Sequence, residues 1–272
     1  MLRQIVASAV ILLPLLIASV WFNEPLPWFT VLAGIWGLLA AVEFYRLSRR
    51  YSPLNFAGLL FILLMIISGH SGAGATLAVL GLAATLTLVI LLFRSRKENA
   101  FLSWAWTIGG VVYIGLLSSY FVALRQMPEG RNWIFLALFV TFASDTAAYF
   151  IGKTWGRHKL LPAVSPKKTW EGAVGGVGGA VIIGLLFSAP QVFGVTNTFY
   201  ISGLTHGEVI LLSLCVSIFG QAGDLAESLL KRNLAAKDSG TSIPGHGVFL
   251  DRLDSLLFAG LVVYFYALWF SG

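Results

Sequence analysis

The sequence has 272 residues, of which 57% are apolar and only 11% charged, and its mean hydropathy is +0.84. These values exclude an ordinary water-soluble globular protein, because a soluble surface cannot absorb so much apolar side chain whereas a lipid bilayer can. The formal net charge is +6, and the single cysteine, Cys215, excludes an internal disulfide and a cysteine-based metal cluster.

Apolar runs long enough for membrane-spanning helices recur along the whole chain. A helix needs about 20 residues to cross the hydrocarbon core, and it satisfies its own backbone hydrogen bonds in lipid. We therefore predict an all-α, polytopic integral membrane protein with about nine transmembrane helices. The first is expected to be a retained helix, since no persuasive cleavage site for a signal peptide follows it. The expected spans are residues 4–22, 28–47, 54–70, 74–93, 104–124, 131–152, 172–190, 207–230 and 254–271.

The basic residues predict the orientation of these spans. If the N-terminus is inside, all but two of the 18 lysine and arginine residues fall in inside segments, and only Arg125 and Arg131 lie outside. The C-terminus is then outside. The basic charge is explained by topology and by attraction to anionic lipid, so no nucleic-acid partner is expected.

Polar residues concentrate in the second half of the chain. We therefore expect residues 1–130 to form an N-terminal region of about five helices with few polar groups, and residues 131–272 a C-terminal catalytic region of about four. Its two long polar loops, 153–171 and 231–253, are expected to face the cytoplasm.

Two carboxylates fall inside expected spans. Asp145 and Asp224 each lie about seven residues from the inner end, roughly 10 Å deep at 1.5 Å per residue. An intramembrane carboxylate needs a partner or a task. In "GDLAESLLKR", helical spacing puts four polar side chains on one stripe, either as an internal ion pair or as part of a functional site. They are Asp224, Glu227, Ser228 and Lys231.

The polar stretch "KDSGTSIPGHGVFLDRLDS", residues 237–255, leads into the last span. Asp251 and Asp254 stand one helical turn apart, and helix capping accounts for one carboxylate but not for two. Clustered carboxylates suit a hard cation such as Mg²⁺, whereas nearby basic groups imply an anion, so the pair indicates a nucleotide or phosphate site. The basic groups are Lys237, His246 and Arg252.

The other inside loop contains "SPKKTWEG". Ser165 is expected to cap a helix with Pro166 at its first position, which puts Lys167 and Lys168 in the first turn. These lysines either set topology only or bind phosphate, and we favour phosphate. The small residues at spacings of four within 172–180 predict close helix packing.

At this point the residues resemble a known family. "SLLKRNLAAKDSGTSIPGHGVFLDRLDS" is similar to the C-terminal signature of the phosphatidate cytidylyltransferases, or CDP-diacylglycerol synthases. "SDTAAYFIGKTWGRHKL" and "SPKKTWEG" resemble the two upstream motifs of that family. The similarity is concentrated in residues 141–258, and "AVEFYRL", with Glu43, is a weaker match. Val248 departs from the pattern, which usually has a second glycine after the histidine.

The resemblance implies a bacterial inner-membrane enzyme of phospholipid biosynthesis, with its active site facing the cytoplasm. It transfers CMP from CTP to phosphatidic acid and depends on Mg²⁺, held by Asp224, Asp251 and Asp254; a second, monovalent cation stays open. The implied catalytic residues are Asp224, Lys237, Asp238, His246, Asp251, Arg252 and Asp254. The implied substrate-binding residues are Asp145, Ser165, Lys167, Lys168, Glu171, Glu227, Ser228, Lys231 and Arg232.

Two other functions remain as alternatives at this stage. Intramembrane carboxylates beside basic residues also occur in ion-coupled transporters, although the broken helices and midplane polar groups of that class are missing from the sequence pattern. The second alternative is another CTP-dependent lipid phosphotransferase or kinase. The sequence leaves the oligomeric state open, with a homodimer among the options.

Overall fold

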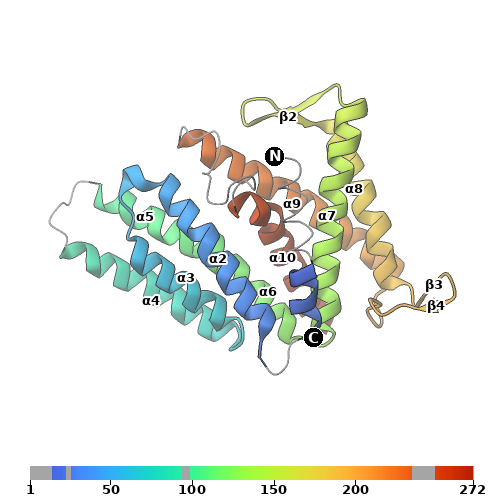
Figure 1. Ribbon diagram of the computed structural model, residues 1–272, viewed down its shortest axis with the longest axis horizontal. Helices are drawn as coiled ribbons and strands as arrows, with labels where there is room; N and C mark the ends of the chain where they lie inside the picture. Colours follow the sequence, from blue (N-terminus) through green and yellow to red (C-terminus); the bar gives the residue numbers. More distant parts are fainter. Residues whose placement is uncertain (1–13, 23–25, 94–98, 235–248, 272) are drawn as a thin grey trace. The chain divides into compact units, whose positions relative to one another are not determined.

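The computed structural model describes residues 14–22, 26–93, 99–234 and 249–271, and most of them are helical (Figure 1). Several residues singled out from the sequence lie outside these ranges, namely Lys237, Asp238, His246 and Val248. The chain forms two compact units. The first comprises Met1–Ala123 and Asn233–Leu253, and the second comprises Leu124–Arg232 and Asp254–Gly272.

Among the described residues, seven helices are long and apolar enough to cross a membrane, which confirms the all-α polytopic class. A further helix, α3 (Asn55–Ser68), is shorter, and residues 14–21 are helical within the first expected span. The number of spans and their orientation stay predictions. The seven are α2 (Trp28–Leu47), α4 (Ala73–Leu92), Ala100–Gln126, α7 (Gly130–Trp155), Trp170–Ser188, α9 (His206–Asn233) and α10 (Leu250–Ser271).

Two of these spans are not uniform α-helix. The span Ala100–Gln126 consists of α5 (Ala100–Gly110), a π-helical stretch η2 (Val111–Leu116) and α6 (Leu117–Gln126). The span Trp170–Ser188 consists of α8 (Trp170–Gly184) and a 3₁₀ turn, η3 (Leu185–Ser188).

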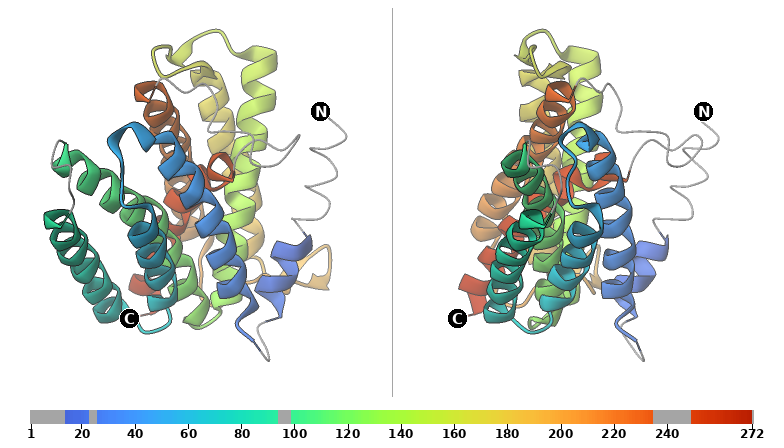
Figure 2. Two further views of the ribbon diagram at one scale, coloured as in Figure 1. Left: turned by 60° about the vertical axis from the view of Figure 1, so that its left-hand side comes forward. Right: turned by 90° about the vertical axis from the view of Figure 1, so that its left-hand side faces the viewer.

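In the first unit α2, α3, α4 and α5 run side by side (Figure 2). Tyr45 of α2 contacts both α3 and α5. Its ring lies between Gly58 of α3 and Gly110 of α5, at positions where a Cβ atom would collide with the ring. The Tyr45 hydroxyl donates to the carbonyl oxygen of Thr107 at 2.9 Å, and the side chain is only 2% exposed. The Thr107 hydroxyl oxygen in turn accepts from the Leu54 N–H at 2.9 Å, so α2, α3 and α5 share one anchored contact.

Small residues allow α7 and α8 of the second unit to pack closely, as the spacing of four predicted. A Cβ atom on Gly179 would lie 2.6 Å from the Ala147 Cβ and 3.0 Å from the Ala143 carbonyl oxygen. A Cβ on Gly176 would lie 3.0 Å from the Ser144 carbonyl oxygen. Backbones that approach this closely leave no room for larger side chains.

A buried hydrogen-bond network ties α9 to this helix pair. The Ser144 and Ser217 hydroxyl oxygens lie 2.7 Å apart, and the Gln221 amide nitrogen donates to the Ser217 hydroxyl at 3.0 Å and to the Ala173 carbonyl oxygen at 3.2 Å. One glutamine therefore connects α8 with α9, and the serine pair connects α7 with α9.

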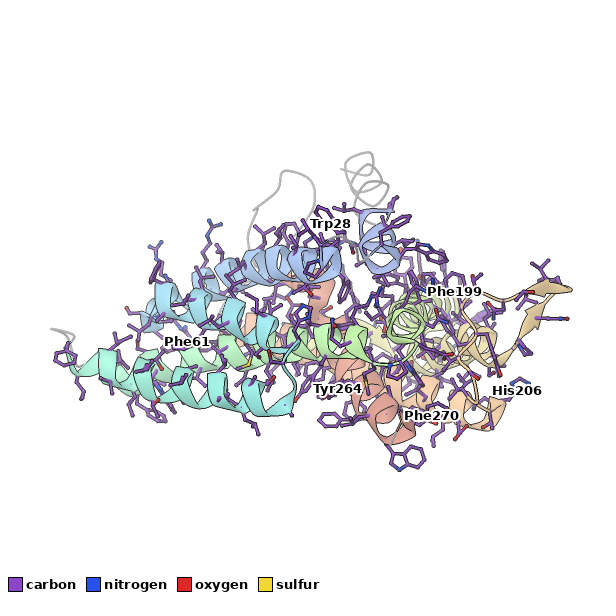
Figure 3. The ribbon with its side chains drawn as sticks, turned by 90° about the horizontal axis from the view of Figure 1, so that it is seen from below. Trp28, Phe61, Phe199, His206, Tyr264 and Phe270 are labelled. Atoms are coloured by element: carbon purple, nitrogen blue, oxygen red, sulfur yellow. The ribbon has the colours of Figure 1, made fainter. Side chains whose placement is uncertain are left out.

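Aromatic packing stabilises the connection between α8 and α9. This connection contains the hairpin of β3 (Gln191–Val192) and β4 (Val195–Thr196). Phe199 follows the hairpin and lies against α7 (Figure 3), with its ring centroid 5.3 Å from that of Phe135 in an edge-to-face arrangement. Edge-to-face pairs at this separation are favourable.

The expected helix start at Ser165 is wrong. Residues Ser165–Thr169 form a strand, β2, that pairs antiparallel with β1 (Lys159–Leu161), and α8 begins only at Trp170. The cap is Thr169, whose hydroxyl accepts from the Gly172 N–H at 3.2 Å. Pairing with a segment four residues upstream satisfies the backbone of 165–169 without a helix. Because side chains alternate along a strand, Lys167 is exposed while Lys168 is half-buried.

Adjacent glycines in α8 give a matched test of this packing. Gly179→Ala should destabilise the protein by about 1–3 kcal/mol, because the new methyl group overpacks the contact with α7. Gly178→Ala should be neutral or stabilise by about 0.5–1 kcal/mol, because a Cβ atom there meets nothing within 4 Å and alanine favours a helix. Thermal unfolding in detergent measures both variants, and equal stabilities would contradict the packing described here.

Candidate active site on α7, α9 and α10

The centre of the candidate site is an ion pair between the β1–β2 hairpin and α9. The Lys168 ammonium lies 2.6 Å from the Asp224 carboxylate, and its side chain is 24% exposed against 36% for Asp224. The ammonium also contacts the Gln221 carbonyl oxygen at 3.5 Å. The strand pairing of Lys168 therefore delivers a cation to the intramembrane carboxylate that the sequence singled out.

Two further aspartates join this pair within the second unit. The charges of Asp145 on α7 and Asp254 on α10 interact with each other and with Asp224. Ser255 connects them, because its hydroxyl is hydrogen-bonded to Asp145 and its N–H donates to the Asp254 carboxylate at 2.6 Å. Asp254 is buried, with 6% of its surface exposed, whereas Asp145 is exposed.

Gly223 allows α9 and α10 to pack closely beside these aspartates. A Cβ atom on Gly223 would lie 2.5 Å from the Asp254 carbonyl oxygen, so only glycine lets α9 and α10 meet at this level. Asp224 is the next residue along α9. We call Asp145, Lys168, Asp224 and Asp254 the carboxylate–lysine cluster. It holds three carboxylates against one ammonium.

The stripe on α9 forms as predicted, but its charges divide between two partners. The Lys231 ammonium lies 3.2 Å from the Glu227 carboxylate, one turn away, and Glu227 is 1% exposed. Glu227 also interacts with Asp254. Glu227 and Lys231 therefore form the internal ion pair that the sequence suggested as one alternative. Asp224 pairs instead with Lys168 of β2, which is not part of α9. Ser228 lies beside them, half-buried.

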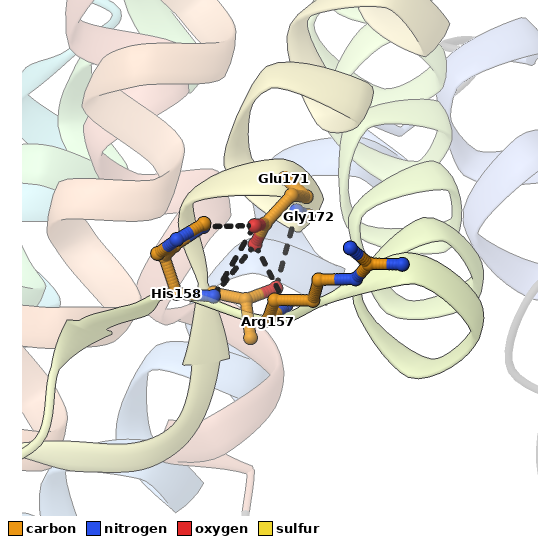
Figure 4. Close-up of polar contacts among 5 residues, drawn as sticks. Arg157, His158, Glu171 and Gly172 are labelled. Atoms are coloured by element: carbon orange, nitrogen blue, oxygen red, sulfur yellow. Dashed lines mark hydrogen bonds and ion pairs between the residues drawn. The ribbon is translucent and has the colours of Figure 1, made fainter.

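Glu171, whose contacts Figure 4 shows, and Arg232 hold the β1–β2 hairpin in place. The Glu171 carboxylate accepts from the backbone N–H groups of Arg157 at 3.1 Å and His158 at 3.2 Å, and it lies 2.6 Å from the His158 Nδ1. The Arg232 guanidinium donates to the Val164 carbonyl oxygen in the turn between the strands. Both residues were expected to bind substrate. In the structure their contacts brace the hairpin that carries Lys168.

The other predicted residues have simpler surroundings. Ser165 is half-buried at the start of β2. Asp251 and Arg252 are exposed in the first turn of α10, one turn before Asp254 along the same helix. Sequence reasoning missed His158, Gln221, Gly223 and Ser255. The last two had a local signal, because Gly223 directly precedes Asp224 and Ser255 directly follows Asp254.

The cluster matches a divalent cation in the chemistry of its donors but not in their placement. Across residues 14–22, 26–93, 99–234 and 249–271, no group of three or more His, Cys, Asp or Glu side chains is placed to hold a metal ion. The donors match Mg²⁺ in chemical type, because they are carboxylate oxygens with an excess of negative charge. In this structure Lys168 supplies the cationic partner of Asp224.

The fold and the cluster together define a polytopic helical membrane protein with an acidic, lysine-paired site within its helices. The sequence profile of the Cytidylyltransferase family matches residues 3–270, and the chain belongs to this family. Curated relatives named phosphatidate cytidylyltransferase align over most of its length.

The relative from Bacillus subtilis (strain 168) is 33% identical over 251 residues, which cover 89% of this chain and 90% of the relative. The relative from Staphylococcus haemolyticus (strain JCSC1435) is 32% identical over 257 residues, covering 93% and 92%. That from Staphylococcus aureus (strain COL) is 32% identical over 232 residues, covering 84% and 85%.

Proposed function

We propose that this chain is a phosphatidate cytidylyltransferase, which transfers CMP from CTP to phosphatidic acid in phospholipid biosynthesis. The observation that carries this proposal is the carboxylate–lysine cluster, which lies in a chain of the Cytidylyltransferase family and is built from the motifs of the resemblance. Relatives that align with more than four-fifths of the chain bear the name of this activity.

The reaction joins two anions. A phosphate oxygen of phosphatidic acid attacks the α-phosphorus of CTP, a new phosphorus–oxygen bond forms, the bond between the α-phosphorus and the bridging oxygen breaks, and pyrophosphate leaves. Because both reactants are negatively charged, neutralising and aligning them is the main catalytic task.

The chain's own residues supply part of that neutralisation. Lys168 stands in the cluster, and the basic groups of Lys167, Lys231 and Arg232 lie on the hairpin and the last turns of α9. A phosphate that enters the cluster competes with Asp224 for the Lys168 ammonium. The lipid's tails stay in the bilayer while its phosphate reaches the end of the spans.

Mg²⁺ dependence is part of the proposal. Asp224, Asp251 and Asp254 are the carboxylates that would hold the ion, and a second, monovalent cation is compatible with so acidic a cluster. When bound, Mg²⁺ neutralises phosphate oxygens and the leaving pyrophosphate. The support is the gathering of three carboxyl groups around one ammonium in the cluster.

The proposed location is the bacterial inner membrane, with the active site facing the cytoplasm and the N-terminus inside. The distribution of basic residues supports this orientation, and the hairpin that carries Lys168 belongs to one of the basic loops. In this orientation CTP reaches the active site from the cytoplasm. The homodimer considered from the sequence stays a prediction. The transporter and lipid-kinase alternatives are not favoured, because neither accounts for the family match.

Labelled CTP tests the function. The purified protein, supplied with phosphatidic acid and Mg²⁺, should move label from [α-³²P]CTP but not from [γ-³²P]CTP into lipid. A lipid kinase gives the opposite pattern, and a transporter labels no lipid. Inverted membrane vesicles test the orientation, because CTP does not cross the bilayer and the cytoplasmic face of these vesicles points outward. External CTP should therefore be used by inverted vesicles. Activity with external CTP only in right-side-out vesicles would contradict a cytoplasmic site.

The two neighbouring lysines of β2 separate a phosphate-binding role from a topological one. Lys168→Gln should lower kcat/KM by about tenfold or more, which is the effect of losing one charged hydrogen bond. Lys167→Gln removes the same charge from the exposed face and should have the smaller effect. Steady-state kinetics for CTP and phosphatidic acid measure both variants. Wild-type kinetics in the double glutamine variant would show that these lysines serve topology only.

A further inference from the structure

Two residues of the first unit contact backbone groups within the part of the chain that carries the family signature. Arg50 lies in η1 (Arg49–Tyr51), directly after α2, and its guanidinium donates to the carbonyl oxygen of Asn233 at 2.8 Å. Glu43 lies on α2, and its carboxylate accepts from the N–H of Leu250 at 3.0 Å. Asn233 ends α9 and Leu250 begins α10, so both flanks of residues 234–249 are held from α2 and η1.

Each contact has the polarity that a helix end favours. The last carbonyl groups of a helix carry partial negative charge and attract a cation, whereas its first N–H groups attract an anion. Arg50 meets the C-terminal end of α9, and Glu43 meets the N-terminal end of α10. The two interactions therefore match two helix ends of opposite partial charge. Arg50 is 183 positions from Asn233 in the sequence, and Glu43 is 207 positions from Leu250.

The Glu43 contact is buried and rigidly supported. Glu43 and Leu250 are each 1% exposed. A buried carboxylate needs a charge-assisted partner, and a backbone N–H at a helix start provides one. Tyr45, two residues further along α2, is locked between Gly58 and Gly110. This lock leaves α2 little freedom to move away from Leu250.

The Arg50 contact is supported by a stack of aromatic side chains. The Arg50 guanidinium lies 4.7 Å from the centre of the Tyr51 ring and 2.6 Å from the Tyr51 hydroxyl. The Tyr51 ring stacks on Trp106 of α5, with centroids 5.3 Å apart and planes 12° from parallel. An arginine side chain held in this way loses less freedom when it binds a carbonyl group.

We propose that Glu43 and Arg50 are positioning residues, which fix the first turn of α10 and the last turn of α9 for CMP transfer. The inference rests on the proposed function and deepens it. The first turn of α10 contains Asp251 and Arg252, and the same helix continues to Asp254. The two contacts thus act on Asn233 and Leu250, which belong to the same compact unit as Glu43 and Arg50.

Variants of Glu43 test the acceptor role. Glu43→Gln keeps an oxygen that accepts from Leu250, whereas Glu43→Leu keeps the bulk and loses the acceptor. Hydrogen exchange of the full-length protein in lipid nanodiscs should show faster exchange of amides 250–253 in Glu43→Leu, and wild-type protection in Glu43→Gln. Tyr45→Phe is the control, because it loosens α2 through the Thr107 contact without removing the acceptor.

Activity completes the test. Glu43→Leu should lower kcat on the order of 10- to 100-fold, because small misplacements of catalytic groups cost this much, while KM for CTP changes little. Glu43→Gln should restore most of kcat. Arg50→Gln should lower kcat in the same way, and Arg49→Gln, which removes the same charge from the adjacent exposed residue, should not.

Two results would overturn the proposal. One is wild-type exchange at residues 250–253 and normal kcat in Glu43→Leu. The other is equal loss of activity in Glu43→Gln and Glu43→Leu with the first turn of α10 still protected, since the carboxylate would then not act as an acceptor for the helix. The exchange measurement does not depend on catalysis, so it reports on Glu43 even if the wild-type protein transfers no CMP.

Discussion

The cost of charge near the hydrocarbon core is the constraint on which the second unit depends. A carboxylate inside a membrane span is unfavourable by a few kcal/mol unless it is paired, hydrogen-bonded or solvated. The ion pair between Lys168 and Asp224 is the direct response to this cost. To form it, the chain must turn back as a hairpin after α7, and a strand must present Lys168 on the side facing α9.

Close helix packing then adds carboxylates around that ion pair. Gly176 and Gly179 bring α8 against α7, and Gly223 lets α10 approach α9 beside Asp224. The buried Ser144–Ser217 contact and the part-buried Gln221 contact hold this arrangement without further charge. The result gathers three carboxyl groups around one ammonium, and carboxylate oxygens are the type of ligand that Mg²⁺ prefers.

Hydropathy and helical periodicity predicted the features that depend on local sequence. The apolar spans, the stripe from Asp224 to Lys231 and the small-residue face of α8 all follow from spacing along one helix. Spacing did not predict β2. The pair Ser165–Pro166 is typical of a helix start, but it also suits an edge strand, and the pairing with Lys159–Leu161 decides between them.

Contacts between distant segments were also outside the reach of local reasoning. From the sequence, Glu43 was only a weak match to a family motif. Its hydrogen bond to Leu250 joins residues 207 positions apart, which local patterns cannot predict. The resemblance assigned Glu171 to substrate binding, which stays a prediction, and the local sequence did not indicate that its carboxylate accepts from the N–H groups of Arg157 and His158. Residues such as Lys237 and His246, which lie outside the described ranges, keep their predicted roles as predictions.

We expect the aspartates on α9 and near the start of α10 to act in CMP transfer. The most direct measurement is the rate of CMP transfer over a range of Mg²⁺ concentrations in Asp224→Asn, Asp251→Asn and Asp254→Asn. Glu208→Gln, at the opposite end of α9, serves as the control. We expect a fall of about 100-fold or more in each aspartate variant, with folding retained, because a preorganised charge is lost at the reacting phosphates. Near-normal turnover of the aspartate variants at limiting Mg²⁺ would contradict it.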